Sequence, residues 1–517
     1  MSTPRRWHPV MLGCATSVLL LGACGGSGQS APTSSAATSN TSAPTPASPE
    51  PAPSTPPPVP VTPSAAWQIP DQNRATGEQW GAYLGASSLL PGDALTVHIS
   101  ADGPVVVTPY RIGDYGGIGG AQVGPGASLT ATRSPTAPQV DPAPLTTVAG
   151  WPETTRLDTA GWPAGFYLVQ VAAEGTATNI PLVVRTADLT DKVVFIAGDL
   201  TWQAYNNWGG RSLYGGPGGF SYRSFGVSFD RPYSSEWEIW NEFDVPIVRT
   251  LEATGVPLGY TSVGAVAVDP ASLLGSEGAI SNGHDEYWTV SYRQALIAAR
   301  DSGSDLAFLG ANAGYWRVRL GPGPGGENRT VIGYKSAALD PLGGSAETTA
   351  RFRDPPQPMP EVEVLGQMYD CYPSRGDATI IDPSFFLFSG TGTSAGSRIP
   401  GLIGIESDRA FARPDTPRPI QVPALSETLC EDGVSWSTMT YYTTGNGAGV
   451  FATGTMNWGP ALAGADRGGL TPESTAFTGT VTANLAKAMA AGPMGTMHPA
   501  RDDFGLIEQL PQQNFAD

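Results

Sequence analysis

The sequence predicts an all-β domain followed by a larger α/β domain. Residues 94–100 alternate apolar and polar side chains, as a half-buried strand does. From residue 193 onward, continuous apolar runs alternate with helical patterns, which is typical of βαβ crossovers and a mostly parallel sheet. Charged residues make up only 14% of the chain, whereas Gly (65) and Pro (49) are abundant, which favours strands and loops over a helical bundle.

The N-terminus has the features of a bacterial lipoprotein signal. Arg5 and Arg6 precede an apolar run that is too short to span a bilayer. The sequence Leu-Gly-Ala-Cys that ends at Cys24 resembles a lipobox, so we expect residues 1–23 to be removed and Cys24 to be lipidated. The alternative is an ordinary secretory signal with a coincidental Cys. We therefore expect a protein anchored by lipid on the extracytoplasmic side of the cell membrane.

Residues 24–65 are nearly all Ser, Thr, Ala, Pro and Gly, so they cannot bury apolar surface and predict a disordered spacer. Residues 66–187 contain short strand patterns, for example at 105–112 and 166–171, and predict an immunoglobulin-like β-sandwich. The net charge of −18 excludes nucleic acid as a partner, because phosphate binding needs a basic surface.

Residues 188–510 predict one α/β domain with β additions. Buried parallel strands are expected at 193–197, 258–263, 278–281 and 306–309, with helices between them. Residues 201–233 predict a long loop rich in aromatic residues and Gly. The β additions include short strands such as 385–388 and a hairpin at 441–453, and a last helix is expected at 474–491.

Two cysteines remain after the signal, Cys371 and Cys430. In an exported protein the expected state is a disulfide between them, and the alternative is two separate buried thiols. Neither belongs to a CxxC pair or to another cysteine-based metal motif.

Three polar and aromatic segments follow predicted parallel strands: residues 202–210, 283–288 and 310–317. The carboxyl ends of such strands form the ligand crevice of open sheets. The chain lacks HExxH and P-loop motifs, and its GxSxG match at residues 392–396 does not lie between a buried strand and a helix. These features argue against a zincin, a serine hydrolase and a nucleotide-binding loop.

Oxygen-rich side chains remain as candidates at this crevice: Tyr205, Asp285 and Glu286, with His284 beside them. Phenolate and carboxylate oxygens suit Fe(III), Mg²⁺ or Mn²⁺ better than a soft metal. The alternative is a helix N-terminus at which Asp285 caps, Glu286 complements the helix dipole and His284 bonds to backbone.

Five segments resemble the large (beta) subunit of N,N-dimethylformamidase in its C-terminal region: residues 202–210, 228–233, 283–288, 315–319 and 457–458. The resemblance extends over residue 67 to the C-terminus and is strongest in the α/β domain. It implies a glutamine-amidotransferase-like fold and an enzyme that hydrolyses a small formamide at a mononuclear iron held by two tyrosines and one glutamate. It also implies a small partner subunit.

Carried onto this sequence, the resemblance implies Glu286 and Tyr205 as iron ligands and Tyr167 as the second tyrosine. We therefore predict an Fe(III)-dependent hydrolase of a C–N amide bond, in which His284, Asn206 or Asn312 orients substrate or transfers protons. The alternative is a non-catalytic lipoprotein that binds an envelope component or serves as a scaffold. The expected partners are a small amide-like substrate or that component, the membrane, and identical chains in a homo-oligomer.

Overall fold

The structure is a computed structural model that describes residues 57–77, 79–431, 433–465 and 467–516. The predicted signal (1–23), the lipidation site Cys24 and most of the predicted spacer lie outside the described residues. The end of the spacer differs from the prediction, because β1 (Val61–Pro63) pairs with a strand of the first domain. Among the described residues, no helix has the length and apolar character needed to cross a membrane.

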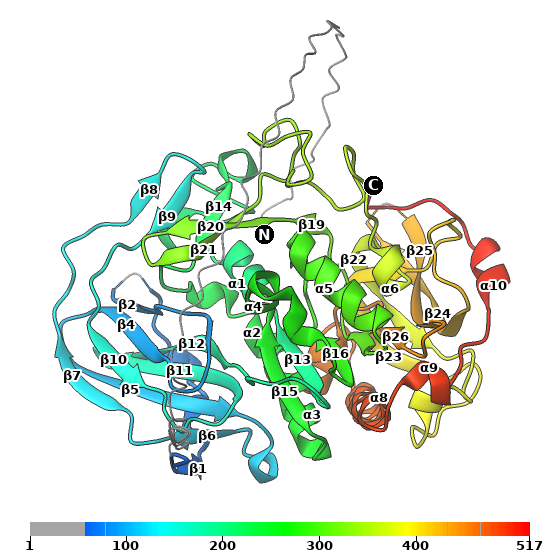
Figure 1. Cartoon of the computed structure of the whole chain (residues 1–517), viewed down its shortest axis with the longest axis horizontal. Helices are drawn as coiled ribbons and strands as arrows, with labels where there is room; N and C mark the ends of the chain where they lie inside the picture. The colour runs from blue at the N-terminus through cyan, green and yellow to red at the C-terminus, as the bar shows by residue number, and fades with distance from the viewer. Residues whose placement is uncertain (1–56, 78, 432, 466, 517) are drawn as a thin grey trace, which may run out of the picture. The chain divides into compact units, whose positions relative to one another are not determined.

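The first domain, blue to cyan in Figure 1, consists mainly of two sheets. The larger has the order β1-β6-β5-β11-β12-β3, with β7 also paired to β5, and the smaller has the order β10-β4-β2. The remaining bounds are β2 (Gly81–Leu84), β3 (Ser88–Leu89), β4 (Ala94–Ser100), β5 (Gly103–Ile112), β6 (Gly120–Val123), β7 (Ala127–Ala131), β10 (Thr155–Asp158), β11 (Gly165–Ala173) and β12 (Thr176–Val184). A β-hairpin, β8 (Gln139–Asp141) and β9 (Thr146–Val148), lies apart from them.

Alternation along β11 gives the larger sheet two buried faces. Tyr167 and Val169 belong to the core of the sandwich. Phe166 and Leu168 belong to a second core that includes Phe195 of the α/β domain. Successive side chains of a strand point to opposite faces of its sheet, so neighbouring residues of β11 serve different cores.

The α/β domain is built on a nine-stranded sheet with the order β15-β13-β16-β18-β26-β25-β24-β22-β23. The first five strands are parallel, and the rest continue the same sheet in antiparallel pairs. The bounds are β13 (Val193–Ala197), β15 (Leu258–Ser262), β16 (Gly278–Ser281), β18 (Asp305–Phe308), β22 (Met368–Thr379), β23 (Arg398–Arg409), β24 (Ile420–Cys430), β25 (Gly433–Thr443) and β26 (Gly449–Ala452). The prediction of an α/β domain with a parallel sheet and β additions is therefore confirmed, as are the four parallel strands and the hairpin.

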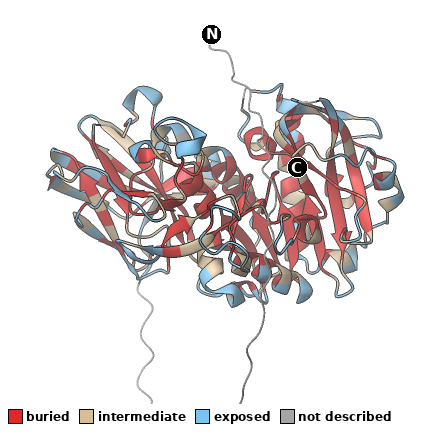
Figure 2. Ribbon diagram, turned by 90° about the horizontal axis from the view of Figure 1, so that it is seen from above, coloured by how far each residue is buried: buried red, intermediate tan, exposed pale blue. Residues whose placement is uncertain are grey.

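Helices pack on both faces of the parallel half. Helices α3 and α8 share a core with one face of β13, and α4 and α5 share a core with the other. All residues of β13, β16 and β18 are buried, and Figure 2 shows large parts of the strands in the colour of buried residues. The helices are α1 (Asp199–Tyr205), α2 (Trp240–Phe243), α3 (Val245–Thr254), α4 (Val263–Val268), α5 (Val290–Asp301), α6 (Val362–Leu365), α7 (Trp458–Leu462), α8 (Pro472–Ala490), α9 (Met494–Met497) and α10 (Phe504–Glu508).

Two local predictions are wrong. The predicted loop that starts at residue 201 instead begins inside helix α1. The predicted strand at 385–388 contains a 3₁₀ turn (Phe386–Phe388), in which aromatic packing replaces strand pairing. Two small sheets complete the domain: β14 (Gly226–Ser228), β21 (Gly326–Ile332) and β20 (Arg319–Gly323) form one, and β17 (Tyr287–Trp288) and β19 (Trp316–Arg317) form the other.

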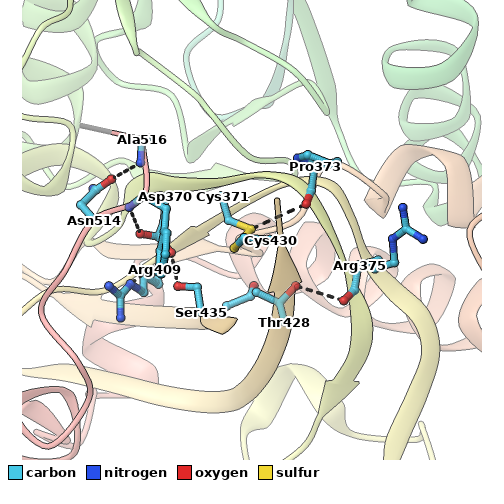
Figure 3. The surroundings of a disulfide bond; sticks show 12 residues. Asp370, Cys371, Pro373, Arg375, Arg409, Thr428, Cys430, Ser435, Asn514 and Ala516 are labelled. Carbon is cyan, nitrogen blue, oxygen red and sulfur yellow. Dashed lines mark hydrogen bonds and ion pairs between the residues drawn. A yellow bond between two sulfur atoms is a disulfide. The ribbon is translucent and has the colours of Figure 1, made fainter. Parts of the chain in front are cut away.

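The predicted disulfide between Cys371 and Cys430 is confirmed and joins β22 to the end of β24 (Figure 3). Its two cysteines are separated by 59 residues, so it limits the freedom of a long segment in the unfolded chain. We expect the double variant Cys371→Ser/Cys430→Ser to lose about 2–4 kcal/mol of unfolding free energy, measured by urea titration. An unchanged urea midpoint would contradict this expectation.

Buried carboxyl groups should make stability depend on pH. Burial raises the pKa of Asp305 and of Asp408 to about 8, from ordinary values near 4. Between about pH 4 and 8 the folded chain keeps these two protons, whereas the unfolded chain loses them. The contribution of the two carboxyl groups to stability is therefore complete below pH 4 and is lost as the pH rises through 8. We expect the urea midpoint to be higher at pH 5 than at pH 8, and Asp305→Asn to flatten this dependence. A midpoint that rises with pH would contradict it.

Candidate functional site

The three predicted segments meet at the carboxyl edge of the parallel strands. Tyr205 ends helix α1, which follows β13. Glu286 lies between β16 and α5, in the second segment, and Asn312 follows β18. Helix α5 begins at Val290 and is capped by the Thr289 side chain, so the alternative in which residue 285 caps this helix is wrong.

Two phenols and an imidazole surround one buried carboxylate. The Tyr205 hydroxyl donates to Oε2 of Glu286 at 2.8 Å, and the Tyr214 hydroxyl donates to Oε1 at 2.6 Å. Nε2 of His284 lies 2.9 Å from the Tyr205 oxygen and 3.4 Å from Oε2 of Glu286. Because the Tyr205 proton is donated to the carboxylate, Nε2 of His284 must carry a hydrogen to complete its contact with Tyr205.

Burial and charge set the protonation of this cluster. Burial, reinforced by the charge of Glu286, raises the pKa of Tyr205 and of Tyr214 well above the ordinary value. Burial disfavours charged His284, but its hydrogen bond to Glu286 and nearby carboxylates outweigh burial and raise its pKa to about 9. Burial also opposes ionisation of Glu286, yet His284 holds the pKa of that carboxyl below its ordinary value. The cluster thus pairs an imidazolium with a carboxylate and keeps both phenols protonated.

A second carboxyl, Glu406, faces the cluster from the antiparallel half of the sheet. Its Oε2 accepts a hydrogen bond from Nδ2 of Asn312 at 3.0 Å and lies 3.9 Å from Nδ1 of His284. Burial, opposed by His284 and reinforced by Glu286, raises the pKa of Glu406 to about 7. The preceding Ile405 has φ 61°, an unfavourable backbone for a β-branched residue, which is consistent with a functional constraint on this position.

A buried amine lies behind the second phenol. Nζ of Lys335 is 3.4 Å from the centroid of the Tyr214 ring, and the Trp316 and Tyr287 rings are also near it. Burial lowers the pKa of Lys335 to about 7, against the attraction of Glu286. The amine can therefore act as a nearby positive charge when protonated.

The structure separates the predicted site residues into two groups. Tyr205, Glu286, His284 and Asn312 come together. Tyr167 does not join them, because its register on β11 directs it into the sandwich, where its hydroxyl donates to the carbonyl of Pro163 at 2.6 Å.

Asn206 is also apart from the cluster and supports the local backbone. Its amide donates to the carbonyl of Pro232 at 2.9 Å, and its Oδ1 accepts from the backbone N–H of Trp208 and of Ser234. Asp285 is bonded to Ser281 and to the hydroxyl of Tyr292 at 3.1 Å. Both side chains therefore serve the fold around the site.

Sequence reasoning missed Tyr214, Glu406 and Lys335. Tyr214 lies in a Gly-rich segment with no motif, and Glu406 follows no parallel strand. The chemical character of each residue is visible in the sequence, but only the tertiary fold brings them to the cluster.

A cavity of about 880 Å³ opens beside the cluster. It is lined by polar side chains, by aromatic rings and by three smaller apolar side chains, Ile405, Met456 and Ala516. These residues include Tyr205, Asn207, Tyr214, Glu286, Asn312, Tyr315, Trp316, Tyr369, Tyr372, Ile405, Glu406 and Met456. A cavity with mainly apolar walls and a few convergent polar groups is the usual form of a small-molecule site.

The fold and the cluster define an α/β protein with a buried tyrosine–carboxylate site at the carboxyl edge of its parallel strands. The family model "N,N-dimethylformamidase beta subunit-like, C-terminal" matches residues 106–471, so the chain belongs to this family, as its resemblance implied. The match begins within β5 and thus includes part of the sandwich. No curated protein matches the chain.

Proposed function

We propose that this protein is an Fe(III)-dependent hydrolase of a C–N amide bond. The observation that carries the proposal is the convergence of Tyr205, Tyr214 and Glu286, which supply two phenol oxygens and one carboxylate within hydrogen-bonding distance. Family membership supports the same reaction class. In this proposal Tyr214 takes the place that the sequence analysis gave to Tyr167.

The donor set fits a hard, highly charged cation. No group of three or more His, Cys, Asp and Glu side chains suited to a metal is found in the described part of the chain, so the phenols are essential to such a site. Buried phenols keep their protons unless a strong positive charge replaces them, and Fe(III) prefers such oxygen donors. When bound, the iron would act as a Lewis acid on a carbonyl group and lower the pKa of water.

The surrounding side chains would position substrate and move protons. His284, which is held between Glu286 and Glu406, can give or take a proton at Nε2. Asn312 holds Glu406 through its Nδ2 and also lines the cavity, so it can orient a carbonyl or amide group there. Asn206 acts in this proposal only by fixing the backbone next to Tyr205.

The proposed setting is the extracytoplasmic side of the membrane, with Cys24 as the lipid-bearing residue. We also propose that the parallel half of the sheet has a glutamine-amidotransferase-like fold and that the sandwich is immunoglobulin-like. The substrate would be an amide that reaches the cavity from outside the cell. We also propose that the chain forms a homo-oligomer.

The test is metal analysis of protein purified without a chelating tag. We expect about one iron per chain and a visible absorption band from tyrosinate-to-iron charge transfer. Supplying iron to protein stripped with a chelator should restore both the band and hydrolysis of a linear amide. Iron-free protein that hydrolyses amides at the same rate would overturn the metal assignment, and iron-loaded protein that hydrolyses none would overturn the reaction.

A further inference from the structure

The cavity beside the cluster is much larger than a small formamide. Its volume of about 880 Å³ would hold roughly thirty water molecules at the density of the liquid. This is the size range of cavities that enclose drug-sized ligands. A one-carbon amide would therefore leave most of the walls without contact.

Aromatic rings form much of the wall that such an amide would leave uncovered. Tyr315 meets Trp316 edge to face at 4.9 Å between ring centroids, and it meets Tyr369 in the same way at 5.1 Å. Tyr372 also lines the cavity and is 59% exposed, so its ring is open to a ligand. Flat apolar groups gain contact area and favourable ring–ring geometry on such walls.

The charged side chains that face the cavity are acidic. Glu286 and Glu406 line it, and no Lys, Arg or His is among the described residues that do. Basic groups touch the walls from behind: Lys335 lies over the ring of Tyr214, and Arg353 lies over the ring of Tyr315 at 5.1 Å. Two phenolates and Glu286 would together balance the charge of a bound Fe(III), so Glu406 remains as the charge that an anionic ligand meets, whereas a cationic ligand could also use the ring faces.

We infer that the natural ligand is an amide with a ring-containing substituent that is uncharged or cationic, and that the cavity rejects carboxylate-bearing ligands. That the ligand is an amide rests on the proposed function, whereas the preferences for its size, ring and charge rest on the cavity itself. Tyr372 and Trp316 contact the ring in this arrangement, and Glu406 provides the selection against anions.

Calorimetric titration of the full chain at pH 8, where Glu406 is mostly ionised, and after removal of iron with a chelator tests the inference without turnover. The probes are N-benzylacetamide and its para-aminomethyl and para-carboxylate derivatives, with N,N-dimethylformamide as the small comparison. We expect the neutral and ammonium probes to bind at least tenfold more tightly than the carboxylate and the small amide. Equal affinity for the carboxylate, or no binding of any ring probe, would overturn the inference.

Variants locate the effect. Tyr372→Ala should weaken the ring probes at least fivefold, whereas Tyr222→Ala, at a tyrosine equally exposed but outside the cavity lining, should leave them unchanged. If Tyr372→Ala does not fold, Trp316→Leu replaces it. Glu406→Gln should reduce the difference in binding affinity between the ammonium probe and the carboxylate probe. Equal effects at positions 372 and 222, or an unchanged charge preference in Glu406→Gln, would overturn it.

The two proposals fail in different ways. Ring probes that bind in the expected order to a protein that hydrolyses no amide would overturn only the proposed reaction. Hydrolysis of small amides, combined with equal binding of the carboxylate probe, would overturn only the ligand class.

Discussion

Replacing Glu286 by Gln is expected to abolish stoichiometric iron binding and to lower amide turnover by about 10²–10³-fold, the scale on which one preorganised electrostatic group acts. A neutral amide is a weaker ligand for a hard cation than a carboxylate. The substitution also removes the charged carboxylate that accepts hydrogen bonds from the Tyr214 and Tyr205 hydroxyls, at 2.6 and 2.8 Å. Iron content by mass spectrometry and kcat on a linear amide check the expectation.

Matched variants make this result specific. Glu327→Gln changes an exposed glutamate and should retain iron and turnover. Tyr205→Phe and Tyr214→Phe should each weaken the charge-transfer band, because one of the two tyrosinates is lost, whereas Tyr167→Phe should leave it unchanged because that hydroxyl is bonded inside the sandwich. A Glu286→Gln protein with wild-type iron content and rate would contradict the proposed ligand set, and so would loss of iron in Tyr167→Phe alone.

Replacing Asp230 by Ala is expected to lower the unfolding free energy by about 3–5 kcal/mol, because it leaves a buried guanidinium without its partner. The side chains of Asp230 and Arg329 are 3% and 9% exposed, and their ion pair is 2.7 Å long. Oδ2 of Asp230 also accepts from the backbone N–H of Gly325 at 2.8 Å. Arg329 additionally donates to the carbonyl of Leu84 in the sandwich, so the pair also joins the first domain to the second.

Urea unfolding measures this effect. Glu153→Ala removes one partner of the exposed pair with Arg156 and should change the urea midpoint little, because exposed pairs contribute little. The double variant Asp230→Ala/Arg329→Met should be more stable than Asp230→Ala, because it no longer buries an unpaired charge. A wild-type midpoint for Asp230→Ala would show that solvent or another group satisfies Arg329.

The parallel half of the α/β domain could be predicted because a strand buried on both faces is a continuous apolar run in the sequence. Each of the strands β13, β16 and β18 is an apolar run, and the segment after each contributes to the crevice. That reasoning brought Tyr205 and Glu286 together without a structure. The short strand patterns and the hairpin also predicted the β additions, but they did not predict that these strands extend the same sheet.

The rest of the site could not be predicted, for two physical reasons. Glu406 lies on β23, at the far end of the sheet order, and meets Asn312, which is 94 residues away in sequence, through tertiary packing that local patterns do not encode. Tyr167 depends on strand register: a shift of one residue would exchange it with Phe166, which faces the α/β domain. A resemblance of short segments does not specify that register.

The disulfide has a consequence for where the protein can work. Cys371 lies on β22 between Tyr369 and Tyr372, and both of these rings line the cavity. The covalent link to Cys430 therefore fixes part of the ligand-binding wall as well as the fold. We expect a chain made in a reducing compartment to carry a loosened wall and to acquire its ligand affinity only after oxidation. Formation of the disulfide would then be a step in the maturation of the binding site.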